Sequence, residues 1–428
     1  MNSALALLAE WMPHQRWYSS KGSAPELRLL ESRQLPSAPG ADAVVMLLIV
    51  VDESASPPIT YQVPIVRRSA ASAADSAHRV GVGDDGTVLV DGPHDIAYTT
   101  VLQEQLALGP QPMTANVLTG EQSNTSIVFR PRSAPPVICK LFRQLNPGVN
   151  PDIELQTALA QAGSAHVPRA VGHLEGSWPD PARADSTITG SLAFAQEFLP
   201  DVEDAWRVAL RAAASGESFT VQAHALGAAT ADVHLSLARL FPTGNADEAA
   251  RGMISGAWQR RLAIATAEVP GLGRHRQAIA AVYERAMSAP WPPLQRVHGD
   301  YHLGQVLHVP RRGWVLLDFE GEPMRPIRER MLPDSALRDV AGMLRSFDYV
   351  AGSLERDGAA SSLSPWARAS RVAFLGGYEH RTGAPATGPL LDAFELDKAV
   401  YEAIYEGRNR PGWLGIPLSA IDRLVGSE

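Results

Sequence analysis

A short polar segment, followed by two acids at the end of the next apolar run, constrains this chain more than any other feature. The segment Val297–Gln305 holds Asp300 and closes with an amide side chain five residues after that carboxylate. The apolar run Trp314–Leu317 predicts a buried strand that ends in Asp318 and Glu320. Acids at the end of a buried strand are costly unless they are paired or bind a metal ion. The combination therefore indicates a functional site.

Transfer of the γ-phosphoryl of ATP to a hydroxyl needs these groups, because one carboxylate orients the acceptor while an amide oxygen and a second carboxylate hold Mg²⁺. The kinase catalytic loop is usually written His-Arg-Asp-x4-Asn, with Asp-Phe-Gly downstream. Here Asp300-x4-Gln305 keeps that spacing, with Gln for Asn, and Asp318-Phe319 follows. The alternative for Asp300 alone is a turn cap. We predict that Asp300 is catalytic and that the metal ligands are Gln305, Asp318 and Glu320.

A second pattern upstream is typical of nucleotide binding. The small polar turn Gly120–Ser126 lies between two apolar segments, which is the layout of a loop that covers phosphates. The strand after it carries one embedded lysine, and a charge in an apolar strand needs a partner. We predict that Lys140 holds the α- and β-phosphates and pairs with Glu154. An ordinary hairpin turn and a lysine that snorkels at a sheet edge are the alternatives.

A third nucleotide contact is expected at the apolar segment Leu192–Leu199, which leads into Pro200. In kinase-like folds such a strand leads to the hinge, whose backbone forms hydrogen bonds with adenine. A strand without a nucleotide contact is the alternative. The predicted nucleotide-binding residues are Ser123, Asn124, Thr125, Lys140, Glu154, Gln196, Glu197 and Phe198.

The chain resembles the aminoglycoside phosphotransferase-like kinases, and within them the bacterial maltokinases and the actinobacterial glucosamine kinases. The strings that carry the resemblance run nearly end to end: Gln15–Tyr18, Glu121–Ser126, Lys140–Arg143, Asn150–Asp152, His298–Leu307, Asp318–Pro323, Leu337–Phe347 and Glu395–Ala399. The resemblance implies an α+β, bilobal, eukaryotic-protein-kinase-like fold with an N-terminal cap subdomain, and ATP and Mg²⁺ as cofactors. We expect the cap at 1–90, a β-rich nucleotide-binding lobe at 91–200 and a mainly helical lobe with the catalytic and acceptor sites at 201–428.

The glucosamine kinase branch is the closest in this resemblance, which implies that ATP and D-glucosamine give ADP and glucosamine 6-phosphate. A maltokinase that makes maltose 1-phosphate, an aminoglycoside phosphotransferase and a non-catalytic kinase-like scaffold are the alternatives. Carboxylates would accept hydrogen bonds from sugar hydroxyls or pair with an ammonium group, and an aromatic ring would pack on the sugar. A solvated charged helix face is the alternative for the C-terminal residues. The predicted acceptor-binding residues are Asp300, His302, Arg345, Glu402, Tyr405, Glu406 and Trp413.

Composition narrows the possible partners and compartment. A formal net charge of −8 and a pI of about 5.9 argue against nucleic acid as a partner. One cysteine excludes an intrachain disulfide and fits a reducing compartment. The first residues lack the basic start of a signal peptide, and the longest apolar run, 43–51, is far shorter than a membrane span. We therefore expect a cytoplasmic monomer that binds neither membrane nor nucleic acid.

Overall fold

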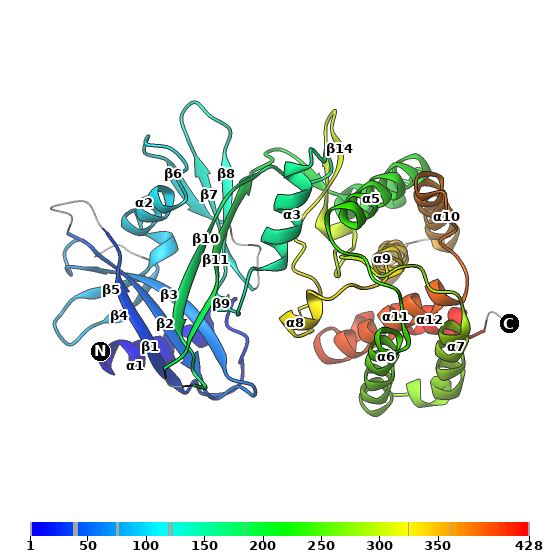
Figure 1. Ribbon diagram of the computed structural model, residues 1–428, viewed down its shortest axis with the longest axis horizontal. Coiled ribbons are helices and arrows are strands. Elements are labelled where there is room, and N and C mark those ends of the chain that lie inside the picture. Colours follow the sequence, from blue (N-terminus) through cyan, green and yellow to red (C-terminus); the bar gives the residue numbers. More distant parts are fainter. Residues whose placement is uncertain are drawn as a thin grey trace. The chain divides into compact units, whose positions relative to one another are not determined.

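The computed structural model describes residues 2–36, 42–73, 77–118, 120, 123–183, 185–323, 325–359 and 361–426. The chain forms two compact units, which Figure 1 colours along the sequence. The first unit comprises Met1–Glu154 and Arg169–Pro200, and the second comprises Leu155–Pro168 and Asp201–Glu428. The division into three parts that the sequence predicts remains a prediction.

The first unit contains an antiparallel sheet in the order β1-β2-β3-β5-β4, with the short strand β9 also paired to β3. The strands are β1 (Leu27–Gln34), β2 (Val44–Asp52), β3 (Ile59–Arg68), β4 (Arg79–Val82), β5 (Val88–Asp91) and β9 (Gln144–Leu145). Helix α1 (Asn2–Trp11) and the 3-10 turn η1 (Met12–His14) precede them, and aliphatic and aromatic side chains of α1, η1 and this sheet form one core. The apolar run 43–51 forms most of β2, and residues 84–86 lie in the hairpin between β4 and β5.

A second antiparallel sheet of the same unit has the order β10-β11-β8-β7-β6. Its strands are β6 (Thr114–Val117), β7 (Thr125–Arg130), β8 (Val137–Leu141), β10 (Ala170–Pro179) and β11 (Thr187–Glu197). The 3-10 turn η2 (Gly92–His94) leads into α2 (Ile96–Gln105), whose apolar residues share a core with this sheet. Helix α3 (Pro151–Gln161) begins after Asn150, whose side-chain oxygen accepts a hydrogen bond from the backbone N–H of Asp152.

The second unit is mainly helical and contains one three-stranded sheet, β12-β13-β14. Its helices are α4 (Ala205–Ala214), α5 (Thr220–Leu240), α6 (Glu248–Glu268), α7 (Arg276–Ser288), α8 (Ile327–Arg330), α9 (Leu337–Arg356), α10 (Ser364–Thr382), α11 (Pro389–Asn409) and α12 (Gly415–Val425). The strands are β12 (Glu203–Asp204), β13 (Val306–Val309) and β14 (Gly313–Leu316), and the 3-10 turns are η3 (Leu272–His275), η4 (Leu303–Gln305) and η5 (Pro411–Trp413). Helices thus make up most of this unit, as expected for the C-terminal part of the chain.

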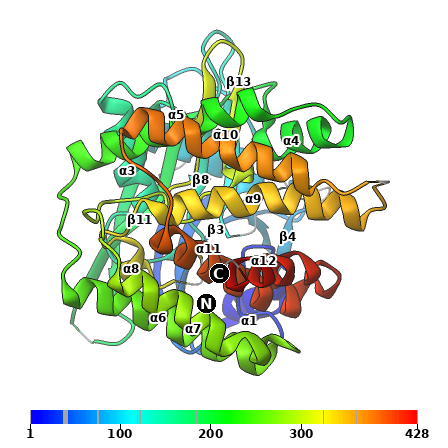
Figure 2. The ribbon, with the colours of Figure 1, turned by 90° about the vertical axis from the view of Figure 1, so that its right-hand side faces the viewer.

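Helices α5 and α10 pack side by side, as Figures 1 and 2 both show. Their closest approach lies at two glycines. A Cβ on Gly227 would lie 2.0 Å from the carbonyl oxygen of Phe374, and a Cβ on Gly377 would lie 2.0 Å from that of His224. Each helix thus rests directly on the backbone of the other, and neither position has room for a side chain.

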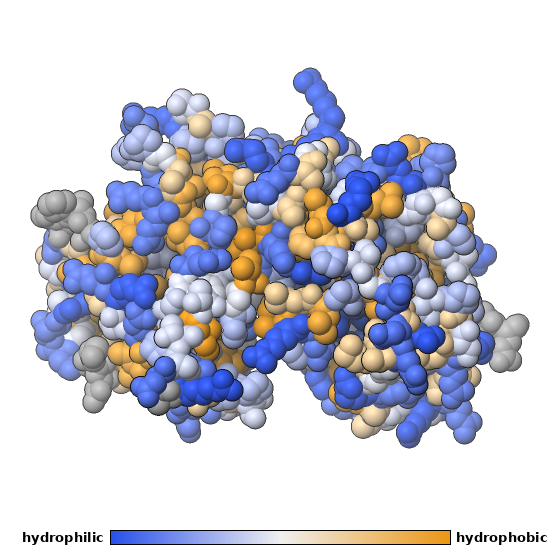
Figure 3. Space-filling model, in the orientation of Figure 1, coloured by the Kyte–Doolittle hydropathy of each residue, from blue (hydrophilic) through white to orange (hydrophobic). Residues whose placement is uncertain are grey.

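Apolar side chains of the helices form one continuous core in the second unit. On the face shown in Figure 3, hydrophilic residues surround small apolar patches. Within the described ranges, no helix has both the length and the apolar composition that crossing a membrane requires.

Candidate active site

The loop that holds Asp300 is fixed to α9 by one buried carboxylate. Asp339 accepts hydrogen bonds from the backbone N–H groups of His298, at 2.8 Å, and Gly299, at 2.9 Å. His234 of α5 lies 2.9 Å from the same carboxylate. Burial would raise the pKa of Asp339, but His234 and the loop N–H groups lower it. Gly299 has φ +84°, a conformation that other residues rarely adopt, so the turn needs glycine there.

Asp300 faces a cation from a helix almost one hundred residues later. Lys398 of α11 donates a hydrogen bond from Nζ to Oδ1 of Asp300 at 3.0 Å, and both side chains are half-buried. Burial would raise the pKa of Asp300, but Lys398 and the nearby His302 hold it at about 2. Asp300 is therefore ionised at neutral pH, which suits orientation of a hydroxyl better than strong general-base catalysis.

The predicted metal ligands meet where β14 ends. The side-chain nitrogen of Gln305 donates to Oδ2 of Asp318 at 3.1 Å, and the backbone N–H of Leu317 donates to the Gln305 carbonyl at 2.9 Å. Asp318 has φ +65°, an unusual backbone conformation for a residue with a side chain. Such outliers persist where the surroundings enforce them and are frequent at functional sites.

His302 caps the turn η4, because its Nδ1 accepts a hydrogen bond from the backbone N–H of Gly304 at 3.0 Å. Burial lowers the pKa of the His302 imidazole, so the neutral ring with its proton on Nε2 is favoured. The nitrogen that remains for a ligand is therefore Nε2, which is consistent with the predicted acceptor contact.

Lys140 lies in β8, which pairs with β7 on one side and β11 on the other. It is therefore not at a sheet edge, and the snorkelling alternative is wrong. The ion-pair partner that the structure shows is Asp152 of α3, with 2.8 Å between Nζ and Oδ2. The sequence predicts Glu154 as this partner, and that residue lies two positions further along α3 with a half-buried side chain. Asp152 is thus an addition to the predicted set.

The predicted nucleotide loop is only partly described, since Glu121 and Gln122 lie outside the described residues. Ser123 and Asn124 precede β7 directly. The hydroxyl of Thr125 is buried and accepts a hydrogen bond from Nε of Arg143 at 2.8 Å. Its side chain therefore belongs to the packing of the sheet, and a phosphate contact there would have to come from the backbone.

The expected hinge segment ends β11. Gln196 and Glu197 pair with β8, and the backbone N–H of Phe198 donates to the carbonyl of Pro136 at 3.0 Å. Arg130 lies over the Phe198 ring, 5.6 Å from its centroid. The Phe198 N–H is thus already bonded within the unit, so adenine would be read by other backbone groups of this segment.

Two of the predicted acceptor carboxylates pack against α9. Glu402 accepts from Nε of the fully buried Arg345 at 2.9 Å. Burial raises the pKa of Glu402, and Arg345 offsets this only in part. Glu406 is buried and accepts from Arg410 at 2.6 Å and from Tyr349 at 3.1 Å. Arg345 and Glu406 are therefore held within the protein, and neither has the free polar surface that a sugar contact needs.

The two predicted aromatic residues of this region differ in their surroundings. Trp413 is covered by Arg356, whose guanidinium lies 3.9 Å from its ring centroid, by Arg410 at 4.7 Å, and by Tyr349 at 6.3 Å. Its faces are therefore occupied by protein groups. Tyr405 is 38% exposed and stacks with Tyr401, which sequence reasoning missed.

Tyr401 could have been found from helical spacing, since residues i, i+3 and i+7 share a face. Lys398, Tyr401 and Tyr405 have this spacing, and Lys398 lies 4.9 Å from the Tyr401 ring centroid. No sequence pattern of this kind identifies two further charged residues of this region, Glu322 and Arg330. Glu322 pairs with Arg261, and the Arg330 guanidinium is attracted electrostatically by Glu320, Glu322 and Asp300.

Comparison with known proteins assigns the chain to a family. The phosphotransferase enzyme family matches residues 114–375, more than half of the chain, and the maltokinase N-terminal cap domain matches residues 11–95. The chain belongs to the phosphotransferase enzyme family. The phosphotransferase thus has the aminoglycoside phosphotransferase-like kinase fold with an N-terminal cap, as the sequence predicts, and it is an ATP-dependent kinase.

Relatives of the phosphotransferase include two glucosamine kinases. That of Streptacidiphilus jiangxiensis is 30% identical over 71% of this chain and 72% of its own length. That of Mycolicibacterium smegmatis is 27% identical over 75% and 81%. A solved glucosamine kinase structure is 26% identical, with a TM-score of 0.68 over 98% of this chain and 99% of that chain. A glucosamine kinase in complex with glucosamine, ADP and inorganic phosphate is 25% identical, with a TM-score of 0.65 over 98% of both chains.

Proposed function

We propose that this phosphotransferase transfers the γ-phosphoryl of ATP to the 6-hydroxyl of D-glucosamine. The observation that carries the proposal is the glucosamine kinase relationship over nearly the whole chain, together with the contact between Asp300 and Lys398. The predicted partner is thus a small amino sugar. Maltose is the second candidate acceptor, because residues 11–95 match a cap domain named for maltokinases.

Asp300 orients the acceptor hydroxyl for in-line attack. Because its pKa is about 2, it accepts a hydrogen bond from the hydroxyl throughout the physiological pH range. Lys398 keeps that carboxylate ionised and in place, and its ammonium group adds positive charge where the phosphoryl group is transferred. Positioning and charge neutralisation then account for most of the rate, as is usual in phosphoryl transfer.

The donor set at the end of β14 fits Mg²⁺. The hydrogen bond from the Gln305 amide nitrogen leaves its oxygen available, and oxygen ligands from amides and carboxylates are those that Mg²⁺ prefers. Gln305 and Asp318 would hold the ion, with Glu320 assisting. When bound, the ion neutralises charge on the transferred phosphoryl group. Lys140, kept in place by Asp152, would hold the phosphates of ATP from the nucleotide side.

The acceptor ring is proposed to lie against the face of α11 formed by Lys398, Tyr401 and Tyr405. The exposed Tyr405 ring offers an apolar surface for the sugar, and hydroxyl groups of both tyrosines offer hydrogen bonds. An ammonium group needs a carboxylate, since an unpaired charge in a closed site is costly. Glu402, one turn beyond Lys398, is the predicted carboxylate that this face still offers, although Arg345 already binds it.

One screen tests the proposal. Purified protein with ATP and Mg²⁺ is assayed against glucosamine, glucose, maltose and an aminoglycoside, and the phosphorylated position is assigned by NMR. Glucosamine 6-phosphate as the preferred product supports the proposal, whereas maltose 1-phosphate would replace it with the maltokinase function. ATP turnover with none of these acceptors would contradict both.

The Glu402→Gln variant tests the amine contact in the same assay. If Glu402 pairs with the ammonium group, the KM for glucosamine rises far more than the KM for glucose. Equal changes for both sugars would instead indicate a contact to a hydroxyl or a structural role. Glu268→Gln, which removes an exposed carboxylate on α6, is the matched control.

A further inference from the structure

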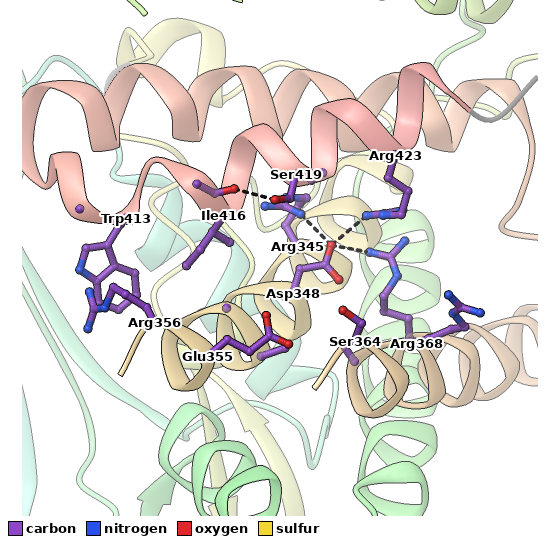
Figure 4. Close-up of a pocket in the computed structure, with 17 residues that line it drawn as sticks. Arg345, Asp348, Glu355, Arg356, Ser364, Arg368, Trp413, Ile416, Ser419 and Arg423 are labelled. Carbon is purple, nitrogen blue, oxygen red and sulfur yellow. Dashed lines mark hydrogen bonds and ion pairs between the residues drawn. The ribbon is translucent and has the colours of Figure 1, made fainter. Parts of the chain in front are cut away.

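A cavity in the helical unit lies among α9, α10, η5 and α12. Its volume is about 700 Å³, within the range of small-molecule sites. Figure 4 shows the side chains that line it, many of them arginines. The lining includes Arg345 and Trp413, which the sequence predicts as acceptor contacts, but none of the residues to which we assign catalysis or metal binding.

Arginine side chains dominate the charge of this cavity. Five of them line it: Arg345, Arg356, Arg368, Arg371 and Arg423. The carboxylates in the lining are Asp348 and Glu355. Glu355 already accepts hydrogen bonds from Ser362 and the backbone N–H of Leu363, outside the cavity lining. The cavity therefore offers mainly N–H donors, which suits an anionic ligand.

Three of the five arginines converge on a single carboxylate oxygen of Asp348, as Figure 4 shows. Oδ2 of Asp348 accepts from Arg345 at 2.7 Å, from Arg371 at 3.2 Å and from Arg423 at 2.8 Å. Glu395 also pairs with Arg371 and Arg423, and Glu402 also pairs with Arg345. The Arg423 side chain is 44% exposed and lines the cavity.

The other two arginines, Arg356 and Arg368, add positive charge that Asp348, Glu395 and Glu402 do not balance. Arg368 of α10 is exposed and has no partner among the described residues. Arg356 stacks on Trp413 and pairs with the exposed Asp357. A ligand phosphate in the cavity would therefore meet Arg368 without having to break a buried ion pair.

We propose that this cavity is a second ligand site that binds a small phosphate ester. The planar guanidiniums match the oxygens of a phosphate group, and the volume accommodates a body of monosaccharide size attached to it. The site is linked to the catalytic residues, since Arg345 bonds both Asp348 in the cavity and Glu402 on α11, one turn from Lys398. The proposal does not depend on which sugar the enzyme phosphorylates.

Calorimetric titration of the full chain with glucose 6-phosphate tests the proposal. The titration is made at constant ionic strength with saturating ADP and the acceptor sugar that the screen above identifies, so that the active site is occupied. Arg368→Ala should weaken binding about tenfold, the usual loss for one hydrogen bond to a charged group. Arg260→Ala, which removes an exposed arginine on α6 outside the cavity, is the matched control and should leave binding unchanged.

A second variant should change the affinity for glucose 6-phosphate in the opposite direction. Asp348→Asn removes the carboxylate that holds three guanidiniums, so the glucose 6-phosphate affinity should rise, a gain that partial unfolding cannot imitate. Inorganic phosphate as a second titrant separates recognition of the phosphate group from recognition of the sugar. No binding to the unaltered protein at millimolar ligand, or equal binding to Arg368→Ala and the unaltered protein, would overturn the proposal.

Discussion

Lys398 donates a hydrogen bond to Asp300 across 3.0 Å, so a helix near the end of the chain sets the charge of the predicted catalytic residue. The pair explains why burial does not raise the pKa of Asp300 above its ordinary value. It also places a cation beside the group that receives the acceptor hydroxyl. Activity should therefore depend on Lys398 as strongly as on residues of the catalytic loop.

Replacing Asp300 by Asn should preserve the fold and ATP binding but lower turnover by roughly 10²–10⁴-fold, because the carboxylate that orients the hydroxyl is lost. Steady-state turnover with glucosamine, together with ADP binding by calorimetry, measures both effects. Turnover close to that of the unaltered enzyme would show that Asp300 only caps its turn.

Replacing Lys398 by Met should change the pH dependence. The folded-state pKa of Asp300 is about 2, below its ordinary value of 3.8, so wild-type kcat/KM should show no acid limb from Asp300 between about pH 4 and pH 8. Without the lysine, burial raises the pKa of Asp300, and an acid limb should enter that range. Lys398→Arg keeps the charge and should restore the flat profile; an unchanged profile in Lys398→Met would remove the role assigned to the pair.

Replacing Asp318 by Asn should abolish Mg²⁺-dependent turnover, because the most direct carboxylate ligand to the ion is lost. Gln305→Ala should weaken turnover less, since water can replace a neutral ligand more easily. Turnover as a function of Mg²⁺ concentration is the measurement. If Asp318→Asn gives the same titration curve as the unaltered enzyme, Asp318 is a structural acid.

Replacing Glu395 by Gln should destabilise the helical unit by about 3–5 kcal/mol, because Arg371 and Arg423 would lose their buried partner. The folded-state pKa of Glu395 is about 2, against an ordinary value of 4.5, so its contribution is present above about pH 4.5 and is lost as pH falls toward 2. Urea unfolding at several pH values measures this. Glu268→Gln breaks an exposed pair with Arg408 and should cost only about 0–1 kcal/mol.

The sequence predicts the catalytic side of the site better than the acceptor side, for a physical reason. Asp300, Gln305 and Asp318 lie in one short segment and its hairpin, so their spacing alone brings Gln305 and Asp318 into contact. The partner of Lys140 depends instead on how α3 is rotated. Asp152 and Glu154 both lie in its first turn, and only packing shows that Asp152 reaches the lysine.

The same limit applies to α11. Helical spacing predicts that Lys398, Glu402 and Tyr405 share a face, but not which side of that face packs on α9. The structure turns Glu402 and Glu406 toward Arg345 and Tyr349 and leaves Tyr405 exposed. A sequence pattern therefore identifies the helix that contributes to a site, whereas tertiary packing decides which of its side chains remain available.

The crossing of α5 and α10 has a consequence for directed evolution of this enzyme. A Cβ at Gly227 or Gly377 would lie 2.0 Å from a carbonyl oxygen of the facing helix, so a saturation library at either codon should return glycine almost alone. Gly376, the neighbour of Gly377, has open space around its would-be Cβ and should accept many residues, with alanine favoured by helix propensity. Two adjacent codons should thus differ widely, because Gly377 accepts almost no substitution whereas Gly376 accepts many. Libraries that explore the helical unit are best directed away from this contact.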